Sequence, residues 1–362
     1  MAKAQTEQTD TLSLPTDVYA SYLVVTPGDG FTSMLGHAAI RMSCPSAGLD
    51  YCFTVKSPEI GNEFTAMTLR TLQAGIVPEE TALFLQDYQQ EGRGISEYSL
   101  RLTLDETRHL WKILDDCVAL GLARHIDYIH NGCAQEMVSI IFAAVQDRHL
   151  PFDEMADELL PYETRRQILA RYKDTSSWKG FIGHTLYGGT PDETVRGTSK
   201  LIMPLDVAAL LEKAELADRP TELAAPTEVE ESGTSPLLSP RLFAILFLLL
   251  CLLPISTPSV RRTLLVLHFL VGVFLVWMVF ISRTPGTEWN WFLIPFNPIP
   301  LLISRWARRR TYATYTVILL AFIAFMLVNL GRIFFIEQLL FVTGVLIQTI
   351  YQTFNINLLK TT

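Results

Sequence analysis

The last third of the chain consists mostly of long apolar runs separated by short basic loops. Five runs can be distinguished, at residues 242–253, 263–282, 292–304, 312–330 and 333–354. The second, fourth and fifth approach or exceed the roughly 20 residues that an α-helix needs to cross a bilayer. The first and third are shorter and are interrupted or followed by prolines, so we expect them to be tilted, kinked or partly re-entrant. Residues 241–362 are therefore predicted to form a membrane domain of about five transmembrane helices, with four as the alternative.

Charge divides at the same boundary. Residues 241–362 carry ten lysines and arginines and two acids, a net charge of +8, so the total of −8 leaves −16 on residues 1–240. In one orientation seven of the ten bases lie in cytoplasmic loops, which is the arrangement that membrane proteins favour. That orientation places the acidic half outside the cytoplasm. An acidic domain also argues against nucleic acid as a partner, since nucleic-acid binding requires a basic surface.

Three further boundaries follow from composition. Residues 1–17 are predicted to be a disordered leader without the apolar stretch of a signal peptide. Ala2-Lys3-Ala4 followed by Gln5 is either the remnant of a signal cleavage site or a chance tripeptide. Residues 18–213 are predicted to be an extracytoplasmic domain. Residues 214–240 are acidic and rich in Pro, Ser and Thr, which predicts a flexible linker.

The pattern of the extracytoplasmic domain predicts an α+β fold. Alternating or β-branched segments predict strands at residues 18–26, 36–43, 51–56 and 98–104, the second and third forming a hairpin. Thr103-Leu104-Asp105-Glu106 is a capping box and predicts the start of a helix. A second amphipathic helix is predicted to follow Asn131-Gly132-Cys133.

Cys133 and His37 are the candidates for chemistry. Cys133 lies at the predicted first turn of its helix, where free N–H groups and the helix dipole favour a thiolate and lower the thiol pKa. His37 follows Gly36 on the strand face opposite Ala38, which suits a general base. The alternatives are a buried cysteine at a helix start and an ordinary surface or core histidine.

The remaining cysteines and motifs carry less information. Cys117 and Cys251 fit apolar helix faces and are interpreted as core residues. Cys44 and Cys52 flank the predicted hairpin and could form a disulfide if the register allowed it. The sequence has no H-E-x-x-H, CxxC, G-x-S-x-G or P-loop motif, so we expect no metal site and no cofactor.

Several motifs resemble the Lnb-type bacterial lipoprotein N-acyltransferases. They are Thr26-Pro27-Gly28-Asp29 with Leu35-Gly36-His37-Ala38-Ala39-Ile40-Arg41, Asp50-Tyr51, Asn131-Gly132-Cys133-Ala134, Leu186-Tyr187-Gly188-Gly189 with Asp192 and Met203-Pro204-Leu205, Trp289-Asn290-Trp291-Phe292, and Pro295-Phe296-Asn297-Pro298. Their order and the membrane domain behind them match that family from about residue 18 to the C-terminus. One departure is Gly132, because the family has Asn directly before Cys.

The resemblance implies a circularly permuted papain-like fold and a role for each candidate residue. Cys133 would take an acyl chain from a diacylglyceryl lipoprotein as a thioester and pass it to the α-amine of the lipoprotein's N-terminal cysteine, leaving a lyso-form. His37 would be the base and Asp50 the group that orients it. Arg41 and Asn131 are candidates for substrate binding, with a structural salt bridge as the alternative for Arg41.

The expected partners are therefore lipoproteins and membrane lipid, in the bacterial inner membrane with the N-terminal domain in the periplasm. Two other classes of function stay open. One is a membrane-anchored Cys-His hydrolase acting on cell-wall peptides, a common use of papain-like folds. The other is a non-catalytic envelope binding protein, which the departure at Gly132 would favour.

Overall fold

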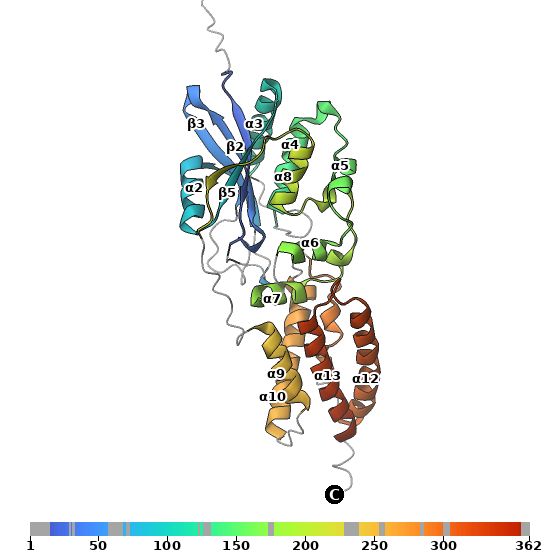
Figure 1. The fold of residues 1–362 in the computed structure, drawn as a ribbon. Helices are drawn as coiled ribbons and strands as arrows, with labels where there is room; N and C mark the ends of the chain where they lie inside the picture. The colour runs from blue at the N-terminus through green and yellow to red at the C-terminus, as the bar shows by residue number, and fades with distance from the viewer. Residues whose placement is uncertain are drawn as a thin grey trace, which may run out of the picture.

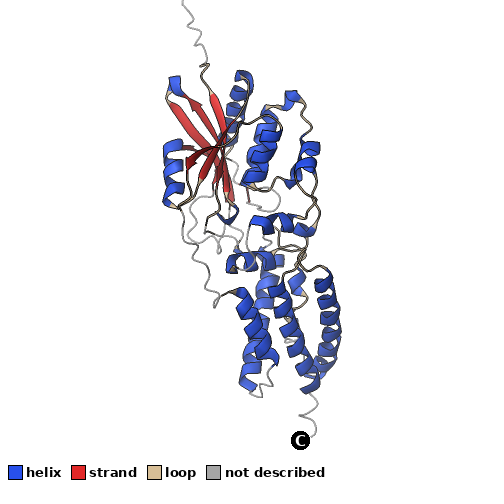
Figure 2. Ribbon diagram, viewed as in Figure 1, coloured by secondary structure: helices blue, strands red, loops and turns tan. Residues whose placement is uncertain are grey.

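The structure is a computed structural model that describes residues 15–28, 30, 33–56, 68–69, 73–121, 124–125, 132–172, 177–227, 239–252, 258–282, 286–299 and 305–355. It contains an antiparallel sheet with helices on both faces, followed by a bundle of long helices (Figures 1 and 2). We call residues 15–227 the sheet domain. The helical bundle is made of α9, α10, α12 and α13.

The sheet has seven strands in the order β6-β4-β3-β2-β1-β5-β7, and all neighbours are antiparallel. The strands are β1 Tyr19–Val25, β2 His37–Cys44, β3 Leu49–Lys56, β4 Gln73–Glu80, β5 Ile95–Ser99, β6 Arg124–His125 and β7 Thr221–Ala224. The predicted strands at 18–26, 36–43 and 51–56 and the β2–β3 hairpin are confirmed. The predicted strand at 98–104 is wrong in its bounds, because β5 ends at Ser99 and the capping box follows closely.

Eleven α-helices and one π-helical segment are found in the described residues besides the strands. In the sheet domain they are α2 Thr81–Gln90, α3 Leu104–Ala119, α4 Cys133–Ala144, α5 Phe152–Leu159, α6 Arg165–Tyr172, α7 Trp178–Leu186 and α8 Pro204–Lys213. In the bundle they are α9 Pro240–Leu252, α10 Pro258–Val276 with its π-helical continuation Trp277–Ser282, α12 Arg305–Val328 and α13 Ile336–Asn355. Both predicted helix starts are confirmed, since Thr103 caps α3 with Glu106 and α4 begins at Cys133.

Alternation along the strands gives the sheet two separate cores. Ala38, Ile40 and Met42 of β2 face the larger core, which α3, α4 and α8 cover. Ala39 of β2 faces a smaller core that α2 covers on the other side of the sheet (Figure 1). Ala38, Ala39 and Ile40 therefore alternate between the two cores, as the pleat requires.

The prediction of a flexible linker at residues 214–240 is wrong for residues 214–227. β7 adds an edge strand to β5, with Ala224 opposite Ile95. Leu216 is fully buried and Ala217 nearly so. Backbone pairing and burial of these side chains hold residues 214–227 in the sheet domain, which therefore extends beyond the expected end at residue 213.

Among its described residues, the helical bundle has two helices long and apolar enough to cross a membrane, at Thr263–Ser282 and Arg310–Val328. The prediction of about five spans is not confirmed. α9 has 13 residues. The described part of the run at 292–304, residues 292–299, contains the end of the one-turn 3-10 helix Trp291–Leu293, followed by turns. α13 is 20 residues long and lies between α9 and α12 (Figure 1).

Backbone contacts seat the sheet domain on the loop between α10 and α12. The Gly188 N–H donates to the Gly286 carbonyl at 2.7 Å, and the Gly189 N–H donates to the carbonyls of Glu288 and Trp289 at 2.9 and 3.1 Å. The two backbone segments approach so closely that a Cβ on Gly188 would lie 1.6 Å from the Glu288 carbonyl oxygen. Glycine at residue 188 is therefore a condition of this packing.

A buried ion pair stabilises the same junction. Arg166, with 1% of its side chain exposed, contacts the Asp192 carboxylate at 2.6 Å. It also donates to the carbonyls of His184 and Gly188, both at 2.7 Å. The other Asp192 oxygen accepts the indole N–H of Trp291 at 3.1 Å. Helix α6, the loop after α7 and the bundle loop are thus joined in one hydrogen-bonded network.

Candidate functional site

His37 is the first residue of β2 and is half-buried. Its ring lies 5.9 Å from the ring of Tyr88, on the face of the sheet covered by α2. Its Nε2 is hydrogen-bonded to the hydroxyl of Thr54, which is fully buried and in turn donates to the Ala38 carbonyl at 3.2 Å.

This chain of hydrogen bonds favours one tautomer of His37. A threonine hydroxyl has one proton, and here that proton goes to the Ala38 carbonyl, so the hydroxyl accepts from Nε2–H. The lone pair is then on Nδ1, the nitrogen that would act as a base. Burial, with the positive charges of Arg93 and Lys56, lowers the pKa of His37 to about 3, so the ring is neutral at physiological pH.

Cys133 is the first residue of α4 and is half-buried against the larger core. Backbone N–H groups, those of Ala38 and Ala134 among them, lie close enough to its sulfur to act on its charge. These N–H groups and the charge of Arg93 favour the thiolate, but burial outweighs them and raises the thiol pKa. The prediction that the helix start lowers the pKa of Cys133 is therefore wrong in sign, and the resting thiol is protonated.

The structure brings Cys133 and His37 to the same end of β2. The Cys133 sulfur lies close to the backbone N–H of Ala38, which directly follows His37 in the chain. The two side chains lie on opposite faces of β2, since Cys133 packs with α4 on one core and His37 contacts Tyr88 on the other. No hydrogen bond joins them in the described structure. The resting site thus has a neutral thiol and a neutral imidazole on opposite faces of the sheet, both at the start of β2.

Asp50 does not orient His37. The hairpin register places Asp50 opposite Ser43, six residues along β2 from His37, which is about 20 Å at the usual rise of a strand. Its carboxylate binds Arg41 through two hydrogen bonds of 2.8 and 2.7 Å and accepts the Thr81 hydroxyl at 2.7 Å. These bonds lower the pKa of Asp50, so the carboxylate stays ionised.

The Arg41 guanidinium is likewise held by ion pairs within the sheet domain. Besides Asp50 of β3 it contacts Glu97 of β5 at 3.0 Å, so its side chain links β2 to β3 on one side and, across β1, to β5 on the other. This is the structural salt bridge that was the alternative to substrate binding. Asn131, the other candidate for substrate binding, lies outside the described residues.

The cysteines of the hairpin do not pair. Cys44 lies opposite Leu49 and Cys52 opposite Arg41, and none of the five cysteines forms a disulfide bond. Within the described ranges, no group of three or more His, Cys, Asp or Glu side chains could hold a metal ion.

Two residues of this site were missed from the sequence. Thr54 is one threonine in an alternating strand, and nothing local shows that its hydroxyl meets His37. Arg93 lies in a Glu-Gly-Arg-Gly turn that reads as an ordinary exposed loop, yet only 4% of its side chain is exposed. The burial of Arg93 depends on pairing between β1 and β5, which local sequence does not show.

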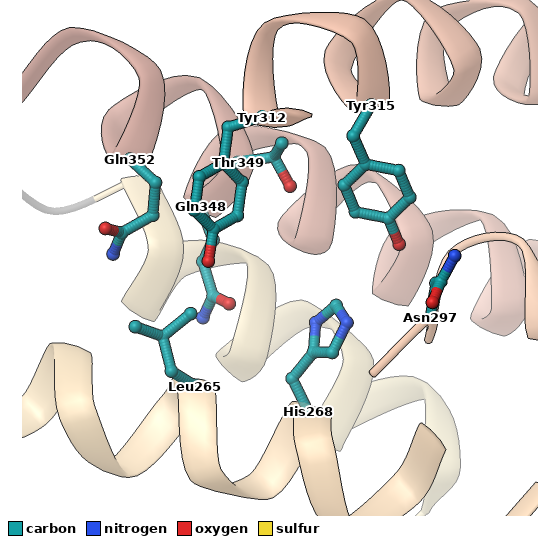
Figure 3. Close-up of a pocket in the computed structure, with 8 residues that line it drawn as sticks. All are labelled: Leu265, His268, Asn297, Tyr312, Tyr315, Gln348, Thr349 and Gln352. Atoms are coloured by element: carbon teal, nitrogen blue, oxygen red, sulfur yellow. The ribbon is translucent and has the colours of Figure 1, made fainter. Parts of the chain in front are cut away.

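A separate polar pocket lies in the helical bundle, as Figure 3 shows. Its described lining is Leu265, His268, Asn297, Tyr312, Tyr315, Gln348, Thr349 and Gln352. The space is about that of one water molecule. It lies between α10, α12 and α13 and is not part of the site at β2.

Comparison with known proteins identifies the first part of the chain. A family model described as the Lnb N-terminal periplasmic domain matches residues 4–171, which include β1 to β6 and the helices from α2 to α6 except the last residue of α6. No curated protein and no solved structure matches the chain. Both His37 and Cys133 fall within the matched residues. Residues 4–171 therefore belong to the Lnb family of N-terminal periplasmic domains, as the motifs predicted.

Proposed function

We propose that this protein is a lipoprotein N-acyltransferase. It moves an acyl chain from the glyceryl group of a diacylglyceryl lipoprotein to the α-amine of the lipoprotein's own N-terminal cysteine. The observation that carries the proposal is the placement of the Cys133 sulfur at the start of α4, beside the backbone of β2 that bears His37. The membership of this segment in the Lnb family supports the same reaction.

The first half-reaction forms a thioester. The Cys133 sulfur attacks the ester carbonyl, Nδ1 of His37 takes the thiol proton, and the carbon–oxygen bond of the ester breaks. His37 then gives the proton to the departing glyceryl oxygen. Attack requires the His37 ring to approach the sulfur around the end of β2, an adjustment of the kind that apo sites undergo when substrate binds.

The second half-reaction transfers the chain. The α-amine attacks the thioester carbon, the carbon–sulfur bond breaks, and the amine proton returns to the sulfur through His37. The backbone N–H groups at the start of α4 point at the sulfur and are placed to stabilise negative charge on the adjacent oxygen in both steps. The products are an N-acyl amide and a lyso-glyceryl group, and no cofactor is needed. Asn131 is retained as a candidate for contact with the lipopeptide.

The helical bundle supports a membrane-bound substrate. We infer a multi-pass protein of the bacterial inner membrane, with the bundle embedded and the sheet domain on the periplasmic side. Two apolar helices of sufficient length and the positive charge of residues 241–362 support this placement. Contacts between Gly188 and the bundle loop hold the sheet domain close to the lipid headgroups, where both acyl donor and amine are located.

The test uses the full-length protein in proteoliposomes with a diacylglyceryl lipopeptide. Mass spectrometry should detect an N-acyl, lyso-glyceryl product of unchanged total mass with the wild type and none with Cys133→Ser. Cys117→Ser is the matched control, because Cys117 is also half-buried against the larger core but lies on α3. We expect its product yield to stay within about twofold of wild type, as for a conservative change away from a site.

Two results would overturn the proposal. One is acyl transfer by Cys133→Ser at the wild-type rate. The other is unchanged lipoprotein N-termini in cells that lack the protein and have no paralogue, together with altered cell-wall fragments, which would favour the Cys-His hydrolase.

A further inference from the structure

Trp289 is held outside the protein by the loop that follows α10. Among the described aromatic residues it is the most exposed, at 84%. Its backbone has a φ of 55°, a conformation that bulky residues rarely adopt. The Gly189 N–H donates to the Trp289 carbonyl at 3.1 Å, and the amide of the next residue, Asn290, donates to two carbonyls at the end of α7 at 3.0 and 2.9 Å. A fixed loop thus exposes a large apolar ring at a cost in backbone free energy.

Helix α7 lies between the sheet and the helical bundle (Figure 1). Two of its aromatic rings pack against phenylalanines near the starts of α9 and α13, with ring centres 5.2 and 5.5 Å apart: Trp178 on Phe243 and Phe181 on Phe341. On the side of the sheet, a Cβ on Gly183 would lie 3.9 Å from the methyl group of Met34, three residues before His37. Helix α7 is therefore the layer between the bundle and the end of β2 that bears His37.

The outer face of α7 is amphipathic. Lys179 and Ile182 are exposed and lie one helical turn apart on the same face. Trp289 lies at the same level, because its neighbour Asn290 is bonded to the end of α7. We call Lys179, Ile182 and Trp289 the interfacial surface. An indole, an aliphatic side chain and a lysine together suit the boundary between lipid chains and headgroups, where the rings are half-immersed and the ammonium reaches the water.

The interfacial surface continues the outer surface of the two candidate spans. Phe280 and Ile281 are exposed at the end of the span Thr263–Ser282, and Trp289 lies in the loop that follows it. Val328, the last residue of the other span, is exposed as well. Exposed apolar side chains on a spanning helix contact lipid chains. The headgroup region is the partner that fits a surface starting where these side chains end.

We propose that the interfacial surface lies in the headgroup region of the membrane, so that the sheet domain itself contacts lipid through α7. The inference rests on the proposed placement of the bundle in the membrane. Removal of the Trp289 indole from water offsets the cost of its backbone conformation. The end of β2 that bears His37 then faces the lipid surface across one helix.

The test is quenching of tryptophan fluorescence by brominated phosphatidylcholine, in phosphatidylcholine vesicles that contain the full-length protein. Bromine quenches an indole only at close range, so its position along the acyl chain reports depth. Emission from Trp289 is the difference between wild type and Trp289→Phe. It should fall about twofold with bromines near the headgroup and change little with bromines near the chain end, as for a residue of an aromatic belt.

Three added indoles locate the surface independently of Trp289. Ile182→Trp on the outer face of α7 should show the same dependence on bromine depth. Tyr19→Trp is the matched control, because Tyr19 is also exposed but pairs with Ser43, at the end of β2 remote from His37. Its emission should be equal in brominated and plain vesicles. Phe280→Trp reports insertion of the bundle and should be quenched.

Failure of the inference differs from failure of the membrane placement. Quenching of Phe280→Trp without quenching of Trp289 and Ile182→Trp would overturn the inference and retain the embedded bundle. Absence of quenching at all three positions would overturn both. Equal quenching of Tyr19→Trp and Ile182→Trp would overturn the inference too, as would an unquenched Trp289 in a protein that sediments as a dimer, which would assign the surface to a second copy.

Quenching does not require acyl transfer, so the inference and the proposed reaction fail separately. A wild type that transfers no acyl chain but shows the expected quenching would refute the acyltransferase and retain the interfacial surface. A wild type that transfers acyl chains while Trp289 stays unquenched would refute the interfacial surface alone.

Discussion

Gly188→Ala should open the junction between the sheet domain and the helical bundle. The new Cβ would lie 1.6 Å from the Glu288 oxygen and 2.5 Å from its carbonyl carbon, and both are backbone atoms that no rotamer change can move. Overpacking of this kind costs about 1–3 kcal/mol. Displacement of the loop also weakens the hydrogen bonds that the N–H groups of Gly188 and Gly189 donate, each worth about 1 kcal/mol. We expect a loss of about 2–5 kcal/mol in the stability of the junction.

Hydrogen exchange by mass spectrometry on the detergent-solubilised protein measures this loss directly. A loss of about 2 kcal/mol speeds exchange of amides that open locally by about 30-fold. The effect should be confined to residues 186–192 and 286–292, while the amides of β2 serve as the internal reference.

Gly189→Ala is the matched control, one residue away. Its Cβ would meet its nearest atoms at 3.5 Å or more, and Gly189 has helical φ and ψ angles that alanine adopts freely. Its effect should stay within about 0.5 kcal/mol. Equal exchange in the two variants would refute the argument that backbone contact at Gly188 holds the junction.

The site and the junction yield three further expectations. Thr54→Val should slow acyl transfer about fivefold, because a neutral hydrogen bond worth about 1 kcal/mol then no longer holds the tautomer of His37. Thr54→Ser should retain the rate, and a faster Thr54→Val would mean that this bond holds an inactive conformation. Because burial raises the pKa of Cys133, its alkylation rate should increase about tenfold per pH unit between about pH 7 and pH 9, and a plateau near neutral pH would contradict the protonated resting thiol. Arg166→Met leaves the Asp192 carboxylate buried without its cation and should lower the free energy of unfolding by about 3–5 kcal/mol. A loss of less than about 1 kcal/mol in a denaturant titration would contradict the stabilising role of the buried pair.

The local sequence pattern was sufficient to predict strand β2, which carries His37, and helix α4, which carries Cys133. Alternation places Ala38 and His37 on opposite faces of β2, and the helix start at Cys133 follows from the Asn-Gly signal and the apolar period behind it. Both are properties of neighbours in the chain. The capping box at Thr103 was predictable for the same reason.

Strand register and side-chain burial depend on residues far apart in the chain, and the wrong predictions concern these two properties. Asp50 is on the predicted strand, but its distance from His37 depends on the hairpin register, which places it opposite Ser43. The helix start alone favours a low pKa for Cys133, and only the packing of α4 on β2 reveals that burial prevails. β7 was missed because an exposed edge strand of four residues has no clear alternation of burial.

Hydrogen bonds from Gly188 and Gly189 to the loop after α10 hold the sheet domain against the helical bundle. If the bundle spans the membrane and Cys133 is the nucleophile, as we propose, its sulfur would keep a constant height above the lipid headgroups. Selection among ester bonds would then be geometric, because the bond held at that height would react and chemically identical bonds at other depths would not. Turnover would accordingly depend on how fast lipids diffuse laterally to the sulfur, and the thickness of the bilayer would affect which chain is removed.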